Sequence, residues 1–285
     1  MHGPEILTRF LERPGPPDKF GNTWQYNSRS DRHSKVGCWG IAFDMLGHSA
    51  RLRQHAVEQK VVLGVNHRMT DFATSRRKDL DLVIARPAAP ITPGSGPSFK
   101  SLAVQYGIEL TPEEAAALDQ LPDIPVGAAG AVLVALEAKA CMTAHIKALP
   151  RLYDELNSSH LCVHGASRSA LAIGFVQVNA SDAFVSSVTN NYPLTDYPVR
   201  YTKHRQPTDT LRVIEKVKEM PRRSQSSEVG FDGVDIPEVN ARDMGAEFTG
   251  LKAITRLESK PIGFGHKAVT GLRGSYGGVL MFGML

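Results

Sequence analysis

Cysteine is scarce in this sequence, which has only Cys38, Cys141 and Cys162. Three scattered cysteines cannot build a disulfide framework, and such usage is typical of a reducing compartment. No stretch approaches 18 consecutive apolar residues, and the first ten residues lack the apolar segment of a signal peptide. We therefore expect no membrane association and a cytoplasmic location.

Motifs that identify several common enzyme classes are incomplete. Residues 94–101 contain glycines, serines and a lysine, but not in the Gly-Lys-Ser order of a phosphate-binding P-loop. Residues 165–169 lack the second glycine of a nucleophile elbow. His160, Cys162 and His164 have no fourth zinc ligand at a suitable spacing. These absences argue against a P-loop enzyme, a serine hydrolase and a zinc protein.

The composition is otherwise that of an ordinary globular protein. The chain has 285 residues, enough for one substantial core with additions or for two small domains. Its net charge of +4 permits an anionic partner without requiring one. Residues 200–223 are more basic, with eight Lys or Arg against three acidic residues. This stretch could contact phosphates or form the solvated face of a helix.

The apolar pattern predicts an α/β fold. The order over the first 180 residues is helix, strand, strand, strand, helix, strand. The expected elements are a helix at 36–59, strands at 61–66, 79–85 and 131–139, a helix from 142 to about 157 with Pro150 as a kink, and a strand at 170–178. The expected domains are an N-terminal extension at 1–35, a core at 36–185 with an insertion at 86–130, and a C-terminal extension at 186–285 packed on the core.

Local sequence signals predict further elements in the insertion and in the N- and C-terminal extensions. Thr111 and Pro112 predict the start of a helix that runs to residue 121 inside the insertion. Residues 208–220 predict another helix, capped by Thr208 or Asp209, and residues 229–239 one more strand. Trp24 lies among aromatic and basic residues that could bind phosphate, but we favour the alternative of a solvated loop with one docked tryptophan.

The centre of the predicted core is the apolar run at 131–136, typical of a strand buried on both faces. Glu137 and Lys139 follow it. Because they are two positions apart on a strand, both side chains are expected on the same face. Charge at the end of a core strand is costly unless it is paired, bound to metal or used in catalysis.

This element order, with an acidic residue on the second strand and Glu-x-Lys at the end of the third, resembles the PD-(D/E)XK nuclease superfamily, which has the restriction-endonuclease-like fold. The resemblance covers roughly residues 36–179. It implies Asp81, Glu137 and Lys139 as the catalytic residues. It also implies that Asp81, Glu137 and the backbone carbonyl of Ala138 bind Mg²⁺, for which Mn²⁺ can substitute.

The implied reaction is hydrolysis of DNA phosphodiester bonds. Carboxylates on adjacent strands supply hard oxygen ligands for Mg²⁺, which polarises the phosphate and activates water. The lysine can orient that water, help to deprotonate it, or stabilise charge on phosphorus. The resemblance thus implies a restriction-type endonuclease, double-stranded DNA as partner and a homodimer. The alternative is a DNA-binding or assembly protein that keeps this fold without catalysis.

The spacing of the motif leaves two aspartates in competition. Asp81 precedes Glu137 by 56 positions, a longer distance than the superfamily usually has, whereas Asp123 precedes it by 14 in a literal Pro-Asp pair. We favour Asp81, because Asp123 lies between prolines that suit a central strand poorly. Gln177, on the last core strand, either points towards the site or forms a hydrogen bond in the core.

Overall fold

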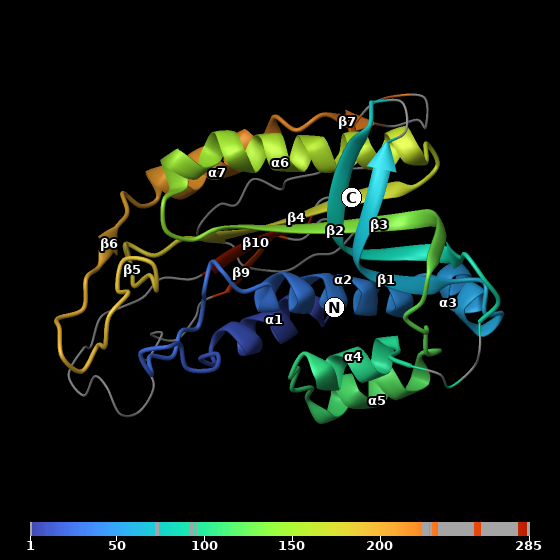
Figure 1. The fold of residues 1–285 in the computed structure, drawn as a ribbon, viewed down its shortest axis with the longest axis horizontal. Helices are drawn as coiled ribbons and strands as arrows, with labels where there is room; N and C mark the ends of the chain where they lie inside the picture. The colour runs from blue at the N-terminus through green and yellow to red at the C-terminus, as the bar shows by residue number, and fades with distance from the viewer. Residues whose placement is uncertain are drawn as a thin grey trace.

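A mixed β-sheet lies between two layers of helices (Figure 1). The computed structural model describes residues 2–71, 74–91, 94, 96–223, 228, 230–232, 254–257 and 279–283. Over these residues the sheet has six strands, in the order β1-β2-β3-β4-β10-β9. They are β1 (Val62–Asp71), β2 (Arg76–Pro87), β3 (Ala129–Cys141), β4 (Leu171–Asn179), β9 (Ile254–Leu257) and β10 (Val279–Gly283).

The sheet combines an antiparallel and a parallel part. β1, β2 and β3 form an antiparallel meander, β4 runs parallel to β3, and β10 is antiparallel to both β4 and β9. A parallel pair needs a crossover connection. Helix α6 (His145–Ala166) provides it between β3 and β4, so the C-terminal ends of β3 and β4 lie at the same end of the sheet.

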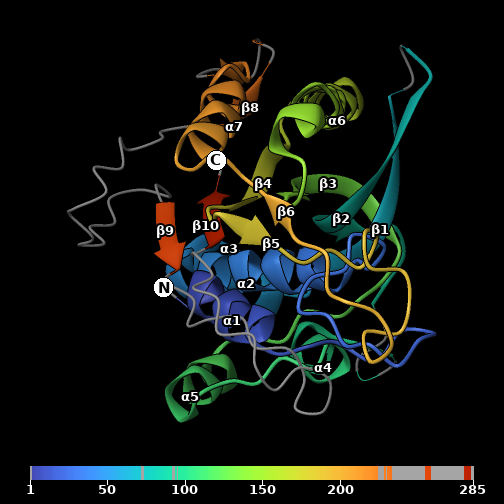
Figure 2. The same ribbon diagram turned by 90° about the vertical axis from the view of Figure 1, so that its left-hand side faces the viewer.

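Helices cover both faces of the sheet, as the two views show (Figures 1 and 2). On one face lie α1 (Gly3–Leu11), α2 (Arg32–His48) and α3 (Ala50–Val57), with α4 (Phe99–Gln105) and α5 (Pro112–Gln120) further out; on the other lie α6 and α7 (Thr208–Lys218). Each layer buries its own apolar cluster against the sheet. Two short strand pairs complete the described part: β5 (Ala183–Phe184) with β6 (Thr202–Lys203), and β7 (Arg222–Arg223) with β8 (Phe231–Asp232).

The predicted element order is confirmed as α2, β1, β2, β3, α6, β4. The predicted helix at 36–59 is two helices, because Ser49 has an extended backbone and caps α3 by accepting a hydrogen bond from the Leu52 N–H. The helix predicted to end near 157 continues to Ala166. Its last turns are held by contacts with the β1–β2 hairpin, including the Cys162 thiol, 3.5 Å from the Met69 carbonyl oxygen.

The insertion between β2 and β3 contains α4 and α5. Helix α5 is confirmed, with the Thr111 side chain accepting from the Glu114 N–H and Glu114 accepting from the Thr111 N–H. Helix α4 was not predicted. It packs through Phe99, which stacks on Trp39 of α2 with ring centroids 4.9 Å apart, while the Trp39 indole N–H donates to the Phe99 carbonyl at 2.9 Å.

Several smaller predictions need correction. Helix α7 is confirmed, but neither Thr208 nor Asp209 caps it, because the N-cap residue is Pro207 and Asp209 accepts from the Arg205 N–H. Trp24 is buried, and its indole N–H donates to Asp18 at 2.8 Å. It is therefore a packed side chain, closed to a phosphate backbone. Of the strand predicted at 229–239, positions 231 and 232 are in β8; positions 229 and 233–239 lie outside the described residues.

The β1–β2 hairpin is longer than predicted, and its two faces exchange sides in the middle. The sequence predicts a polar link between residues 66 and 79, but the strands pair as far as Asp71 and Arg76. The ladder skips one pair, Asn66 and Asp81, and Asn66 has a φ of 49°. Residues two apart on a strand normally share a face, yet Leu80 packs in the cluster beneath α6 and Leu82 in the cluster beneath α2. The hairpin therefore turns over at Asp81: the face of β2 that carries Leu80 and Leu82 is directed towards α6 at Leu80 and towards α2 at Leu82.

Among the described residues, none of the helices is long and apolar enough to cross a membrane.

Candidate functional site

Glu137 and Lys139 lie side by side at the open edge of β3. The Lys139 Nζ is 2.7 Å from the Glu137 Oε1, so the two side chains share a face as the strand period predicts. The Glu137 side chain is 4% exposed and that of Lys139 23%. The Glu137 Oε2 atom is buried and has no hydrogen-bond partner among the described residues. One oxygen of this carboxylate is thus paired and the other is left for a ligand.

Asp81 approaches the same edge from β2. The β2–β3 ladder ends at the pair of Leu82 and Leu136, and beyond it the Asp81 Oδ2 accepts a hydrogen bond from the Ala138 N–H at 2.7 Å. The N–H and C=O of one residue in a ladder point to the same neighbouring strand. The carbonyl of Ala138 therefore also points to the edge that Asp81 occupies.

Three further charged side chains join the site, and the sequence analysis missed them. Lys78 of β2 lies 3.9 Å from the Glu137 Oε1, and Glu155 of α6 lies with its Oε2 3.4 Å from the Lys139 Nζ. Arg151 donates to the other oxygen of Glu155 at 2.6 Å. Glu155 had a signal in the sequence, because it stands between the apolar residues Leu152 and Leu156 that mark the buried face of α6. Lys78 had no such signal in the sequence, because it lies in the polar link between residues 66 and 79, which was not predicted to be a strand.

The site lies between the start of α2 and the middle of α6. Lys139 acts electrostatically on His33, in the first turn of α2, and pairs with Glu155 on α6. Asp31 and Ser34, also at the start of α2, act on the pKa of Asp81. Both helical layers therefore contribute residues to one edge of the sheet.

Burial governs the ionisation of the two carboxyl groups. It raises the pKa of Asp81, and the hydrogen bond from Ala138 and the charge of Lys139 offset only part of this rise. It also raises the pKa of Glu137, with Lys139 opposing and the charge of Asp81 adding to the rise. The pKa of Lys139 is raised as well, because the carboxylates of Glu137, Glu155 and Asp81 outweigh the effect of its burial. The site therefore favours an ammonium group at Lys139, and the two carboxylates lack full compensation.

These residues fit a divalent cation with oxygen ligands. The unpartnered Glu137 Oε2, the carboxylate of Asp81 and the carbonyl of Ala138 are hard oxygen donors at one edge. A cation there would supply the positive charge that burial makes favourable for both carboxylates. The donor set suits Mg²⁺ or Mn²⁺ better than a metal that prefers sulfur.

The other two candidates lie elsewhere. Asp123 is exposed and accepts a hydrogen bond from the Lys100 N–H at 3.0 Å, in the first turn of α4. Gln177 is fully buried, and neither atom of its amide has a hydrogen-bond partner within the described part of the chain. It shares a face with Phe175, in the cluster beneath α2, whereas Lys139 pairs with Glu155 of α6. The structure thus brings Asp81, and neither Asp123 nor Gln177, to the Glu137 edge.

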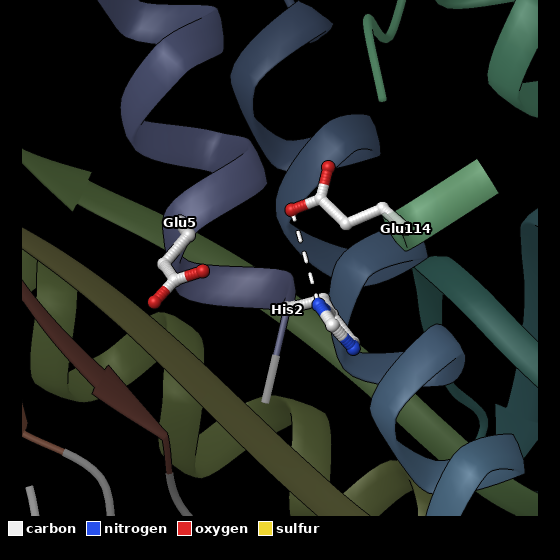
Figure 3. Close-up of side chains that lie close together, drawn as sticks. All are labelled: His2, Glu5 and Glu114. Atoms are coloured by element: carbon white, nitrogen blue, oxygen red, sulfur yellow. Dashed lines mark ion pairs between the residues drawn. The ribbon is translucent and has the colours of Figure 1, made fainter. Parts of the chain in front are cut away.

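A second group of candidate metal ligands lies at the start of α1 (Figure 3). His2, Glu5 and Glu114 each place a ligand atom within 4.8 Å of the others. However, the Glu114 Oε2 accepts hydrogen bonds from the Thr111 N–H and from Arg9, and its Oε1 is 3.9 Å from the His2 Nδ1. These contacts explain Glu114 as a buried link between α1 and α5.

The sequence matches the isoniazid-induced protein IniA of Mycobacterium tuberculosis, in two strains, at 51% identity over 59 residues. This similarity covers 21% of the chain and 9% of IniA. No protein-family model matches the chain, and no solved structure matches it.

Proposed function

We propose that the protein is a metal-dependent endonuclease of the PD-(D/E)XK superfamily, with a restriction-endonuclease-like core formed by α2, β1, β2, β3, α6 and β4. The observation that carries the proposal is the meeting of Asp81, Glu137 and Lys139 at one edge, where β2 leaves β3. Asp81 lies on β2, and Glu137 and Lys139 lie on β3. In the sequence these two strands are separated by the insertion that contains α4 and α5. Their convergence is a property of the fold that the motif alone does not provide.

Each residue has a role in phosphodiester hydrolysis that follows from its surroundings. Asp81, Glu137 and the Ala138 carbonyl hold the cation, which when bound polarises the phosphate and lowers the pKa of a water molecule. Lys139 is an ammonium among carboxylates, so it donates hydrogen bonds that orient the attacking water and stabilises negative charge on phosphorus. This assigns Lys139 the positioning role and makes it a poor general base.

A basic and aromatic surface near the site suits a nucleic acid substrate. Tyr197, Arg200, Tyr201, Lys203 and Arg205 are all exposed on the segment between β5 and α7. His204, in the same segment, lies with its Nε2 3.2 Å from the carbonyl oxygen of Thr143, just after β3. Thr143 is four positions from Lys139 and β3 ends at Cys141, so the chain between them spans at most roughly 13 Å. A DNA strand whose phosphate lies at Lys139 would therefore come within a few nucleotides of His204 and of its exposed neighbours Lys203 and Arg205.

The direct test is cleavage of supercoiled and linear double-stranded DNA with Mg²⁺, with Mn²⁺ and with chelator. We expect cleavage only with a divalent cation, and its loss in Glu137→Gln, which removes the charge that binds the cation but retains size and shape. Asp123→Asn is the matched control and should cleave as the wild type does. DNA binding without cleavage under every metal condition would favour the alternative, a DNA-binding protein that keeps this fold without catalysis.

A further inference from the structure

The charged side chains that β2, β3 and α6 contribute to the candidate site are equally divided between positive and negative before any cation binds. Lys78, Lys139 and Arg151 balance Asp81, Glu137 and Glu155. Two of these ammonium groups face the same atom, since the Glu137 Oε1 lies 2.7 Å from Lys139 and 3.9 Å from Lys78. A cation that binds Glu137 must therefore compete with lysines that already pair with it.

Glu155 offers Lys139 a second partner. Its Oε2 is 3.4 Å from the Lys139 Nζ, and its Oε1 is engaged by Arg151 of the same helix, one turn earlier. One oxygen of Glu155 is thus held by Arg151 while the other faces Lys139. The side chain of Glu155 is 28% exposed and that of Lys139 is 23% exposed, so solvent only partly screens the pair.

We propose that Glu155 is a positioning residue that takes over Lys139 when a divalent cation occupies Glu137. This inference rests on the proposed function. Retained by Glu155, the ammonium stays beside the cation instead of leaving the site or opposing the cation at the carboxylate. Glu155 then promotes cation binding through Lys139, although it is not itself a ligand.

The test measures Mn²⁺ affinity in the absence of DNA, from the electron paramagnetic resonance signal of free Mn²⁺. We expect Glu155→Gln to weaken Mn²⁺ binding roughly threefold to fivefold, the range of a partly screened ion pair. The matched control is Asp154→Asn, which removes the same charge from the neighbouring, exposed position of α6 and should change the affinity much less. Lys139→Met should strengthen Mn²⁺ binding, because it removes the competing ammonium.

A double-mutant cycle separates this role from a simple charge effect. In the Lys139→Met background, Glu155→Gln should no longer weaken binding beyond the effect of Asp154→Asn. If Glu155→Gln lowers the Mn²⁺ affinity equally with and without Lys139, the inference is overturned. Glu155 would then act on the cation directly through its charge and not through Lys139. Unchanged affinity in Glu155→Gln alone would also overturn it. Urea unfolding of each variant verifies that the fold is intact.

Failure of the inference and failure of the proposed function give different results. If the wild type binds Mn²⁺, loses it in Glu137→Gln and cleaves DNA, while Glu155→Gln resembles the wild type, only the role of Glu155 is wrong. If Glu137→Gln binds Mn²⁺ as well as the wild type does, the cation does not bind at this edge and both proposals fall.

Discussion

Substitutions at Asp81 separate its structural contact from its proposed role in cation binding. Its carboxylate accepts a hydrogen bond from the Ala138 N–H, a group that is buried because Ala138 is only 6% exposed. Asp81→Ala leaves this N–H without an acceptor, which costs about 1–3 kcal/mol. Asp81→Asn retains an acceptor through its amide oxygen but removes the charge that we propose binds a cation. We expect both variants to lose metal-dependent cleavage and only the alanine variant to lose stability.

The pH dependence of stability predicts in addition how Asp81→Asn compares with the wild type. Because the pKa of Asp81 is raised in the folded protein, its stabilising contribution is complete below the pKa of the unfolded chain and is lost as the pH rises through the folded pKa. Asparagine does not ionise and escapes this loss. At pH 7, Asp81→Asn should therefore be at least as stable as the wild type.

The assay is urea unfolding at pH 7, together with cleavage of double-stranded DNA. For a urea m value of about 3 kcal/mol/M, the midpoint of Asp81→Ala should fall roughly 0.3–1 M below that of Asp81→Asn. Cleavage by Asp81→Asn at the wild-type rate would refute the metal-binding role of Asp81. Equal midpoints for the two variants would show that the contact with Ala138 contributes nothing to stability.

Further predictions concern three other residues. Lys139→Ala should keep its fold and lose cleavage by orders of magnitude; normal cleavage by a folded variant would remove Lys139 from the mechanism. Burial lowers the pKa of His33 to about 4, so the wild type should lose stability as the pH falls from about 6.5 to 4, by at most about 3 kcal/mol. In urea titrations His33→Gln should lose less over this range, and an equal loss would contradict the assignment. Lys203→Ala should reduce the salt dependence of DNA affinity by roughly one phosphate contact; Lys60→Ala, at the far end of the sheet, should leave the slope unchanged, and identical slopes for both variants would remove Lys203 from the interface.

The sequence was sufficient where one physical pattern dominated. The run at 131–136 is apolar at every position, so burial on both faces makes it a core strand in almost any context, and the period of two then places Glu137 beside Lys139. The order of α2, β1, β2, β3, α6 and β4 follows from similar local patterns. The same reasoning favoured Asp81 over Asp123, because prolines at 122 and 125 suit a central strand poorly.

The sequence was insufficient where distant contacts overrode local preference. The second half of α6 contains Ser158, Ser159, His160 and Gly165, which favour a helix weakly. It is nevertheless helical where Cys162 packs against the carbonyls of Met69 and Arg76 on the hairpin. The polar residues of the hairpin likewise pair as strands, because α6 covers one side of them. Lys78 and Glu155 could be assigned to the site only after these contacts were known.

The irregularity at Asp81 opens the edge of the sheet at which the proposed active site lies. Had the β1–β2 hairpin continued without turning over, β2 would have paired with β3 beyond Leu82, and a backbone group would have satisfied the Ala138 N–H. The carbonyl of Ala138 would then also have been used in the ladder. Because the hairpin turns away, the Asp81 side chain replaces the missing strand as the partner of Ala138.

The ladder hydrogen bonds lost at this turn are offset by packing of the hairpin against α6, where Leu80 and Met69 are buried. Asn66, opposite Asp81, has a left-handed backbone at the same point. Such conformations persist only where surrounding contacts enforce them, and they concentrate at functional sites. The packing of α6 on the hairpin therefore keeps the edge of β3 open, while the same helix carries the Glu155 that faces Lys139. The helix that stabilises the irregular hairpin thus also contributes to the proposed chemistry.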